Sequence, residues 1–263
     1  MNTIFSVQDR QDTFDYILLT ARQCGKIVSL VQIGSGAIGY RDDRSDLDFV
    51  IALDRDDSMA EVMEYMHRRI SEQYELLFLK QDAPRHHQVF LLSNLLEIDF
   101  GYGAYEYAAA LKPAFKVLYD HSGTVEEKMI RSLEGMGDRI YGEKQKKDIE
   151  IACQSVWARL MHAATAIRRG EYFRVAGELE SVRKLYIDLL GDRYRLDSSM
   201  YREIDRVPEY EKAAIRGTFI SGETPAELWE RLLNLTDLVY KELEGYPVPV
   251  TKEMLYTYYR GLM

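Results

Sequence analysis

The chain has 263 residues, of which 46% are hydrophobic, and its formal net charge is −9. This length allows one large domain or two ordinary ones, and the hydrophobic content is sufficient for a folded core. The acidic balance argues against a protein whose main task is to grip nucleic acid, because phosphate contacts need clustered Lys and Arg. We therefore expect no nucleic-acid partner.

The sequence shows no signal for export or membrane insertion. Its two cysteines, Cys24 and Cys153, fit neither a disulfide framework nor a metal-binding spacing. No apolar run approaches the roughly 20 residues that a membrane-spanning helix needs, and the first residues do not resemble a secretion signal. We predict a cytoplasmic protein with reduced thiols and no membrane partner.

The first half of the chain alternates between helical and strand patterns of apolar residues. The expected helices cover residues 8–24, a segment starting near 57, and 104–111. The expected strands cover residues 27–33, 47–53, 74–80, 88–92, 95–102 and 115–120. Ser93 and Asn94 are expected to close a hairpin between the strands over residues 88–92 and 95–102.

Strand patterns nearly vanish in the second half of the chain. Helical periodicity covers residues 144–169, 171–190, 199–217 and 225–244, and a short last helix is expected after residue 249. Helices joined by short links indicate an up-down bundle. The sequence therefore predicts an α+β protein with an N-terminal domain over residues 1–142 and a helical domain over residues 143–263.

The strongest functional signal lies in residues 32–53, which read QIGSGAIGYRDDRSDLDFVIAL. If a strand begins at Leu47, Asp46 and Asp48 point to the same face. Two neighbouring carboxylates both stay ionised when a cation lies between them, and Mg²⁺ usually takes one or two carboxylates plus substrate phosphates. The segment therefore predicts that Asp46 and Asp48 hold a magnesium ion.

Gly34-Ser35, which ends the preceding apolar run, would supply the phosphate side of this site. A glycine lets the backbone approach a phosphate closely, and free N–H groups at a following helix start can bind the anion. Taken alone, each half has an ordinary structural explanation, since D-x-D is common on surfaces and G-S is a common turn. Together they predict a site for a Mg²⁺–nucleoside triphosphate complex.

A third carboxylate is expected on the strand over residues 95–102. Its apolar residues share one face, whereas Glu97 and Asp99 share the other. An ionised residue in such an apolar strand is unusual, although a strand with one wet face is the plain alternative. Glu97 is a rival of Asp99, which we prefer because it lies nearer the glycines at 101 and 103.

Gly34-Ser35, followed eleven positions after the serine by Asp46-Leu47-Asp48, resembles the signature of the nucleotidyltransferase superfamily that includes DNA polymerase β. Three weaker patterns add to this: the strand carrying Asp99, the VLYDHSG segment at 117–123 and the RRGEYFR segment at 168–174. Nearly end to end, the chain resembles the antibiotic nucleotidyltransferases, and most closely the small lincosamide nucleotidyltransferases.

The resemblance implies a mixed, twisted sheet flanked by helices, followed by a helical bundle, and it implies a homodimer. It also implies transfer of AMP from ATP to a hydroxyl of a small molecule, such as a lincosamide or an aminoglycoside, with loss of pyrophosphate. Asp46, Asp48 and Asp99 would be the Mg²⁺ ligands, and Asp99 would act as general base. The lincosamide relatives carry glutamate at that position, so this chain keeps the carboxylate with a shorter reach.

Further residues are candidates for binding the triphosphate. Ser35 and the backbone at Gly34 would hold the terminal phosphates, and Arg44 and Ser45 directly precede the aspartates. Lys184, on the second expected helix of the helical domain, could close onto the pyrophosphate end. The plain alternatives are a solvated loop arginine for Arg44 and a solvated helix face for Lys184.

Two other functions compete with small-molecule modification. The same catalytic core could act on a protein partner, as an AMPylating or antitoxin-like module, although the large helical half favours a small acceptor. A degenerate protein that binds ATP without turnover is the third possibility. The presence of all three carboxylates argues against it.

Overall fold

The computed structural model describes residues 4–110, 112–134, 136–222 and 224–263. The chain divides into two compact units, Met1–Gly135 and Met136–Met263. The boundary predicted at residue 142 falls inside helix α4 (Met136–Arg169), which begins before the apolar periodicity that reveals it in the sequence.

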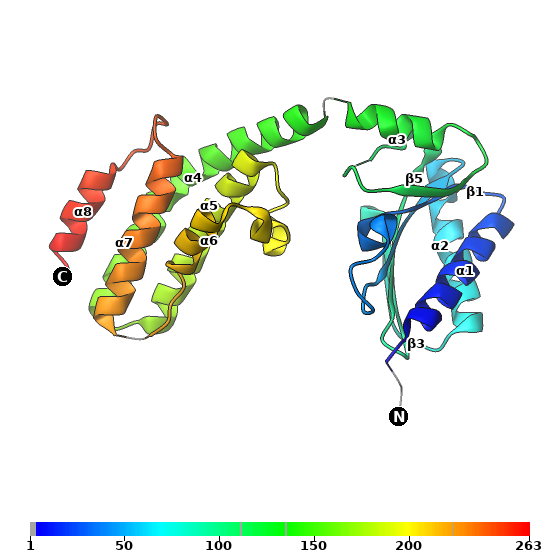
Figure 1. Cartoon of the computed structure of the whole chain (residues 1–263), viewed down its shortest axis with the longest axis horizontal. Helices are drawn as coiled ribbons and strands as arrows, with labels where there is room; N and C mark the ends of the chain where they lie inside the picture. Colours follow the sequence, from blue (N-terminus) through cyan, green and yellow to red (C-terminus); the bar gives the residue numbers. More distant parts are fainter. Residues whose placement is uncertain (1–3, 111, 135, 223) are drawn as a thin grey trace. The chain divides into compact units, whose positions relative to one another are not determined.

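The first unit is built on a six-stranded sheet with the strand order β3-β4-β5-β2-β1-β6 (Figure 1). Its strands are β1 (Ile27–Gln32), β2 (Leu47–Leu53), β3 (Leu76–Asp82), β4 (His87–Leu92), β5 (Glu97–Ala104) and β6 (Lys116–Asp120). Only the central pair β2 and β5 is parallel, and the other neighbours are antiparallel. The predicted α+β class and the mixed sheet are confirmed.

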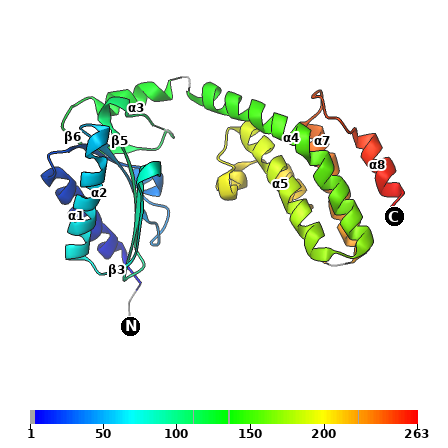
Figure 2. The same cartoon turned by 180° about the vertical axis from the view of Figure 1, so that it is seen from behind.

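Helices α1 (Val7–Gln23) and α2 (Met59–Gln73) cover one face of this sheet (Figures 1 and 2). Alternate residues of β2, starting at Leu47, join the buried cluster that contains Ile17 of α1 and Met66 of α2. Helix α3 (Val125–Leu133) covers part of the opposite face through a smaller cluster. Because strand side chains alternate, polar residues of β2 and β5 lie on this second face.

The predicted hairpin is present, because residues 93–96 connect β4 to β5 and Leu95 turns the chain with a φ of 68°. The helix predicted over residues 104–111 is wrong. A short 3-10 turn, η4 (Tyr105–Tyr107), stands there, and residue 111 lies outside the described residues. Ala110 is buried beside α3, and its N–H donates to the Oγ atom of Ser132 instead of to a carbonyl within a helix.

The second unit is helical throughout its regular structure in the described residues. Besides α4 it contains α5 (Tyr172–Tyr194), α6 (Glu209–Arg216), α7 (Pro225–Glu242) and α8 (Lys252–Arg260). The long helix predicted over residues 199–217 is wrong, because two 3-10 turns, η5 (Ser199–Tyr201) and η6 (Ile204–Arg206), precede α6. Pro208 caps α6 and prevents a continuous helix, since proline lacks the N–H and disfavours helical backbone before it.

Among the helices in the described ranges, none combines the length and the apolar character that crossing a bilayer requires.

Candidate functional site

Asp48 and Asp99 stand next to each other on the two central strands. β2 and β5 run parallel, with Asp48 in register with Asp99 and Leu47 in register with Ile98. Leu47 and Ile98 are fully buried under α1 and α2, so the two aspartates lie on the opposite face. Adjacent strands are about 4.8 Å apart, which places the two carboxylates as direct cross-strand neighbours.

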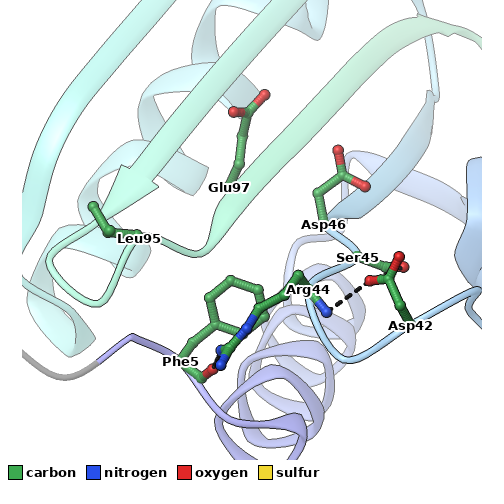
Figure 3. A pocket seen from close by; sticks show the side chains of 7 residues that line it. All are labelled: Phe5, Asp42, Arg44, Ser45, Asp46, Leu95 and Glu97. Atoms are coloured by element: carbon green, nitrogen blue, oxygen red, sulfur yellow. Dashed lines mark hydrogen bonds between the residues drawn. The ribbon is translucent and has the colours of Figure 1, made fainter.

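A second pair of carboxylates, Asp46 and Glu97, precedes the first pair by two residues on each chain segment. Figure 3 shows both side chains projecting to the same side of the sheet. Burial raises the pKa of Glu97, and the negative charges of Asp46 and Asp99 raise it further, while His87 acts in the opposite direction. Four carboxylates therefore share one region of negative potential.

Gly34 lies directly against the carboxylate of Asp48. Its φ is 63°, and a Cβ atom at this position would lie 2.1 Å from Oδ2 of Asp48. The N–H of Ile33 also donates to the carbonyl of Asp48 at 3.0 Å, which ties the turn to the start of β2. Only glycine fits here, because the backbone is left-handed and the space for a side chain is occupied.

Ser35 follows in η1 (Gly34–Ile38), a 3-10 turn of five residues. A helical turn therefore does follow the end of β1, but a turn this short supplies no extended helix N-terminus for a phosphate. The Oγ atom of Ser35 is hidden from solvent and has no hydrogen-bond partner among the residues that the structure describes. It is a hydroxyl for which the described protein provides no partner.

The loop before Asp46 is held by Arg10, a residue that the sequence patterns did not single out. Its Nη1 donates to the carbonyls of Asp42 at 3.0 Å and Ser45 at 3.1 Å. Its guanidinium stacks 3.8 Å from the ring centroid of Tyr40, and the residue is only 5% exposed. An arginine on an amphipathic helix usually faces solvent, so nothing in the sequence distinguishes it.

Arg44 and Ser45 are engaged locally. Arg44 donates to the carbonyl of Phe5 through its guanidinium, which Figure 3 shows beside the Phe5 ring, and its backbone N–H donates to Asp42 at 2.7 Å. Ser45 Oγ donates to the same carboxylate of Asp42 at 3.3 Å. A pocket of about 330 Å³ lies beside them, and its lining comprises Phe5, Asp42, Arg44, Ser45, Asp46, Leu95 and Glu97.

His87 is a further residue that the sequence patterns did not reveal. It begins β4, and its Nε2 atom lies 2.6 Å from Oδ1 of Asp99, with each side chain about one-third exposed. The contact depends on the antiparallel pairing of β4 with β5, in which Val89 faces Asp99 and His87 faces Gly101. Such a diagonal pair becomes visible only when the strand register is known.

Lys184 belongs to the second unit, on α5. Its Nζ pairs with the carboxylate of Asp188 one turn later, and Asp188 also accepts a hydrogen bond from Ser198 at 2.6 Å. Its neighbour Arg183 is buried and donates to the side chain and the carbonyl of Thr218. The role of Lys184 at a pyrophosphate stays a prediction.

Two of the three weaker patterns of the resemblance have structural explanations. In the VLYDHSG segment, the Asp120 carboxylate accepts hydrogen bonds from the N–H groups of Ser122 at 2.9 Å and Val125 at 2.7 Å, so it caps the start of α3. Burial acts to raise the pKa of Asp120, but these hydrogen bonds prevail and lower it. In RRGEYFR, Gly170 makes the left-handed turn between α4 and α5, with a φ of 71°.

The oxygen donors fit magnesium in kind, though not as a preformed cage. Within the described residues, no group of three or more His, Cys, Asp or Glu side chains is gathered closely enough to hold a metal ion. Mg²⁺ keeps several waters and is commonly bound through one or two carboxylates plus substrate phosphates. The Asp48–Asp99 pair, with Asp46 beside it, supplies carboxylates of that kind.

No protein-family model and no curated protein matches the chain. The likeness to nucleotidyltransferases therefore stays with the motif residues and their arrangement.

Proposed function

We propose that the protein transfers a nucleoside monophosphate, AMP from ATP, to a hydroxyl of a small molecule in a Mg²⁺-dependent reaction that releases pyrophosphate. The observation that supports it most is the register of Asp48 with Asp99 on adjacent parallel strands, with the Gly34 turn against Asp48. A motif near residue 34, an aspartate pair and a distant carboxylate thus meet on one face of one sheet.

In this reaction the acceptor oxygen attacks the α-phosphorus of the triphosphate. The new oxygen–phosphorus bond forms as the bond from the α-phosphorus to the pyrophosphate oxygen breaks, and the hydroxyl proton passes to the carboxylate of Asp99. Such a displacement depends mostly on positioning and on neutralising charge. Asp99 is the base in this proposal because it is in register with Asp48 on the neighbouring strand, whereas Glu97 lies two residues earlier on β5.

The crowding of carboxylates explains why a cation is needed. Asp46, Asp48, Glu97 and Asp99 repel one another and would repel a triphosphate. Burial is the main cause of the raised pKa of Glu97, and the charges of Asp46 and Asp99 add to it. Bound magnesium would supply charge neutralisation for the triphosphate and the leaving pyrophosphate. Asp46, Asp48 and Asp99 are the residues that would hold it.

Other residues would bind the nucleotide in this proposal. The buried hydroxyl of Ser35, which lacks a partner in the described residues, is a donor that a phosphate oxygen could satisfy. Arg44 would exchange the Phe5 carbonyl for a phosphate, and Ser45 stands beside it in the pocket. Lys184, the homodimer, and a lincosamide or aminoglycoside acceptor enter the proposal from the resemblance.

The test is release of pyrophosphate from Mg²⁺-ATP by purified protein, with a panel of lincosamides and aminoglycosides. Acceptor-dependent release should disappear in Asp99→Asn and persist in Glu97→Gln, and Asp57→Asn, at an exposed carboxylate outside the site, is the control. If wild-type protein binds Mg²⁺-ATP but releases nothing with any acceptor, the small-molecule proposal is refuted. If it binds no triphosphate, the site assignment itself is refuted.

A further inference from the structure

We propose that His87 is a positioning residue for Asp99, holding its carboxylate in the orientation that receives the acceptor proton. The inference rests on the proposed function for its catalytic consequence. Its structural basis is the 2.6 Å separation between Nε2 of His87 and Oδ1 of Asp99.

The sheet brings this histidine to Asp99 from the side opposite Asp48. In the strand order β4-β5-β2, Asp99 lies on the middle strand, His87 on one neighbour and Asp48 on the other. The residue directly across from His87 is Gly101, so the imidazole reaches Asp99 diagonally, two residues along β5. A Cβ atom at Gly101 would have its nearest neighbour, a methyl of Val50, at 3.8 Å, so this face is open there.

Asp99 needs such a partner because of its other neighbours. Asp48 stands in register with it and Glu97 precedes it on the same face, so negative charge would turn an unsupported carboxylate away. A proton on Nε2, 2.6 Å from Oδ1, would offset that repulsion and fix one oxygen of the carboxylate. The second oxygen then remains for the magnesium ion assigned to Asp99 and for the proton of the attacking hydroxyl.

Removing such a supporting group typically costs about 10–100-fold in activity while the directly acting groups stay in place. We therefore expect His87→Ala to lower kcat about 10–100-fold, with the KM for Mg²⁺-ATP changed less than about twofold. His87→Gln should recover much of the loss, because its amide N–H can reach a similar position. A purely structural role would change KM and kcat together and would show no such recovery.

The chain offers a matched control in His67. It lies on α2, it is 34% exposed in its side chain against 32% for His87, and it faces Glu64 at 3.7 Å. His67→Ala should leave both kcat and KM unchanged. Circular dichroism of all three variants establishes that they fold.

A second measurement needs no acceptor. Long-range ¹⁵N–¹H NMR spectra of the histidine rings should show a proton on Nε2 of His87, and Asp99→Asn should shift that nitrogen while leaving the His67 signals in place. A His87 signal insensitive to Asp99→Asn overturns the inference, whatever the enzyme does.

Normal kcat in His87→Ala overturns it as well. If the NMR coupling is present but wild-type protein transfers nothing to any acceptor, the proposed function fails, and the positioning role fails with it. Failure of the inference and failure of the proposed function are therefore distinguishable. An insensitive His87 signal shows that the contact with Asp99 is absent, whereas absent transfer with the NMR coupling present shows that the reaction is wrong.

Discussion

Replacing Gly34 with alanine tests whether the close packing of the Gly34 backbone on the carboxylate of Asp48 matters for stability and activity. The new Cβ atom would lie 2.1 Å from Oδ2 and 2.9 Å from Cγ of Asp48. Ordinary contact begins at 3.4 Å, so the carboxylate oxygen must retreat by about 1.3 Å, the difference between the two distances. A displacement of this size in a reacting group costs about 10²-fold in rate.

The stability cost has two parts. A non-glycine residue at a left-handed φ costs about 1–2 kcal/mol, and forcing Asp48 off its rotamer adds about 0.5–1.5 kcal/mol. Gly123 is a matched control, because its φ is 65° against 63° at Gly34, and a Cβ atom added there would meet nothing within 4 Å. Gly123→Ala should therefore show only the first part and should leave activity intact.

Hydrogen exchange followed by mass spectrometry is the suitable assay. Both tryptophans, Trp157 and Trp229, lie in the second unit, so their fluorescence reports the wrong half of the chain. The slowest peptides of β1 and β2 report the free energy of opening in the first unit. We expect Gly34→Ala to lower it by about 1 kcal/mol more than Gly123→Ala, and we expect this excess to vanish in an Asp48→Ala background. An excess that persists without the Asp48 side chain would refute the reasoning.

Three further predictions concern residues other than Asp46, Asp48 and Asp99. Arg10→Met keeps the packed stem but leaves the carbonyls of Asp42 and Ser45 without their donor, at a cost of about 1–3 kcal/mol in stability. Peptides over residues 40–46 should then exchange faster. The control is Arg41→Met at an exposed position, which should leave exchange unchanged. Asp120→Ala removes the cap of α3 and should lower its protection by about 1 kcal/mol, whereas unchanged exchange in α3 would contradict the capping role. Burial raises the pKa of Asp192 to about 6, so between about pH 4 and 6 the folded unit keeps a proton that the unfolded chain has released, and stability falls as pH rises. Asp192→Asn should flatten that slope in urea unfolding followed by tryptophan fluorescence, and an unaltered slope would exclude Asp192 as its source.

Much of the fold follows from local patterns in the sequence. The alternation in β5 puts Ile98 and Phe100 in the core and therefore Asp99 on the outer face, and the same reasoning applies to Asp46 and Asp48 around Leu47. Burial on one face forces this choice, because a slip of one residue would expose the apolar set. Helical periodicity likewise reveals α5 and α7 of the second unit, whose observed bounds lie close to those predicted.

The two misplaced helices have different physical causes. Residues 104–111 and 199–217 have helical composition, yet tertiary contacts at Ala110 and the proline at 208 interrupt them. Periodicity registers neither, since a tertiary hydrogen bond leaves no local pattern and a proline acts on the residues before it. The sequence pattern also places the start of α4 too late, because the first residues of this helix lack the apolar repeat.

The site residues that the sequence could not reveal are those that depend on pairing between distant segments. Arg10 looks like any helix-surface arginine until the loop over residues 40–45 is folded beneath it, and His87 acquires a partner only through the register of β4 with β5. The choice between Asp99 and Glu97 has the same origin. A shift of two residues between β2 and β5 would keep every apolar side chain in the core and set Glu97 beside Asp48, so hydrophobic patterning alone cannot distinguish the two registers. The register in the folded sheet favours Asp99, and His87 is the neighbour that then gives that carboxylate a fixed orientation.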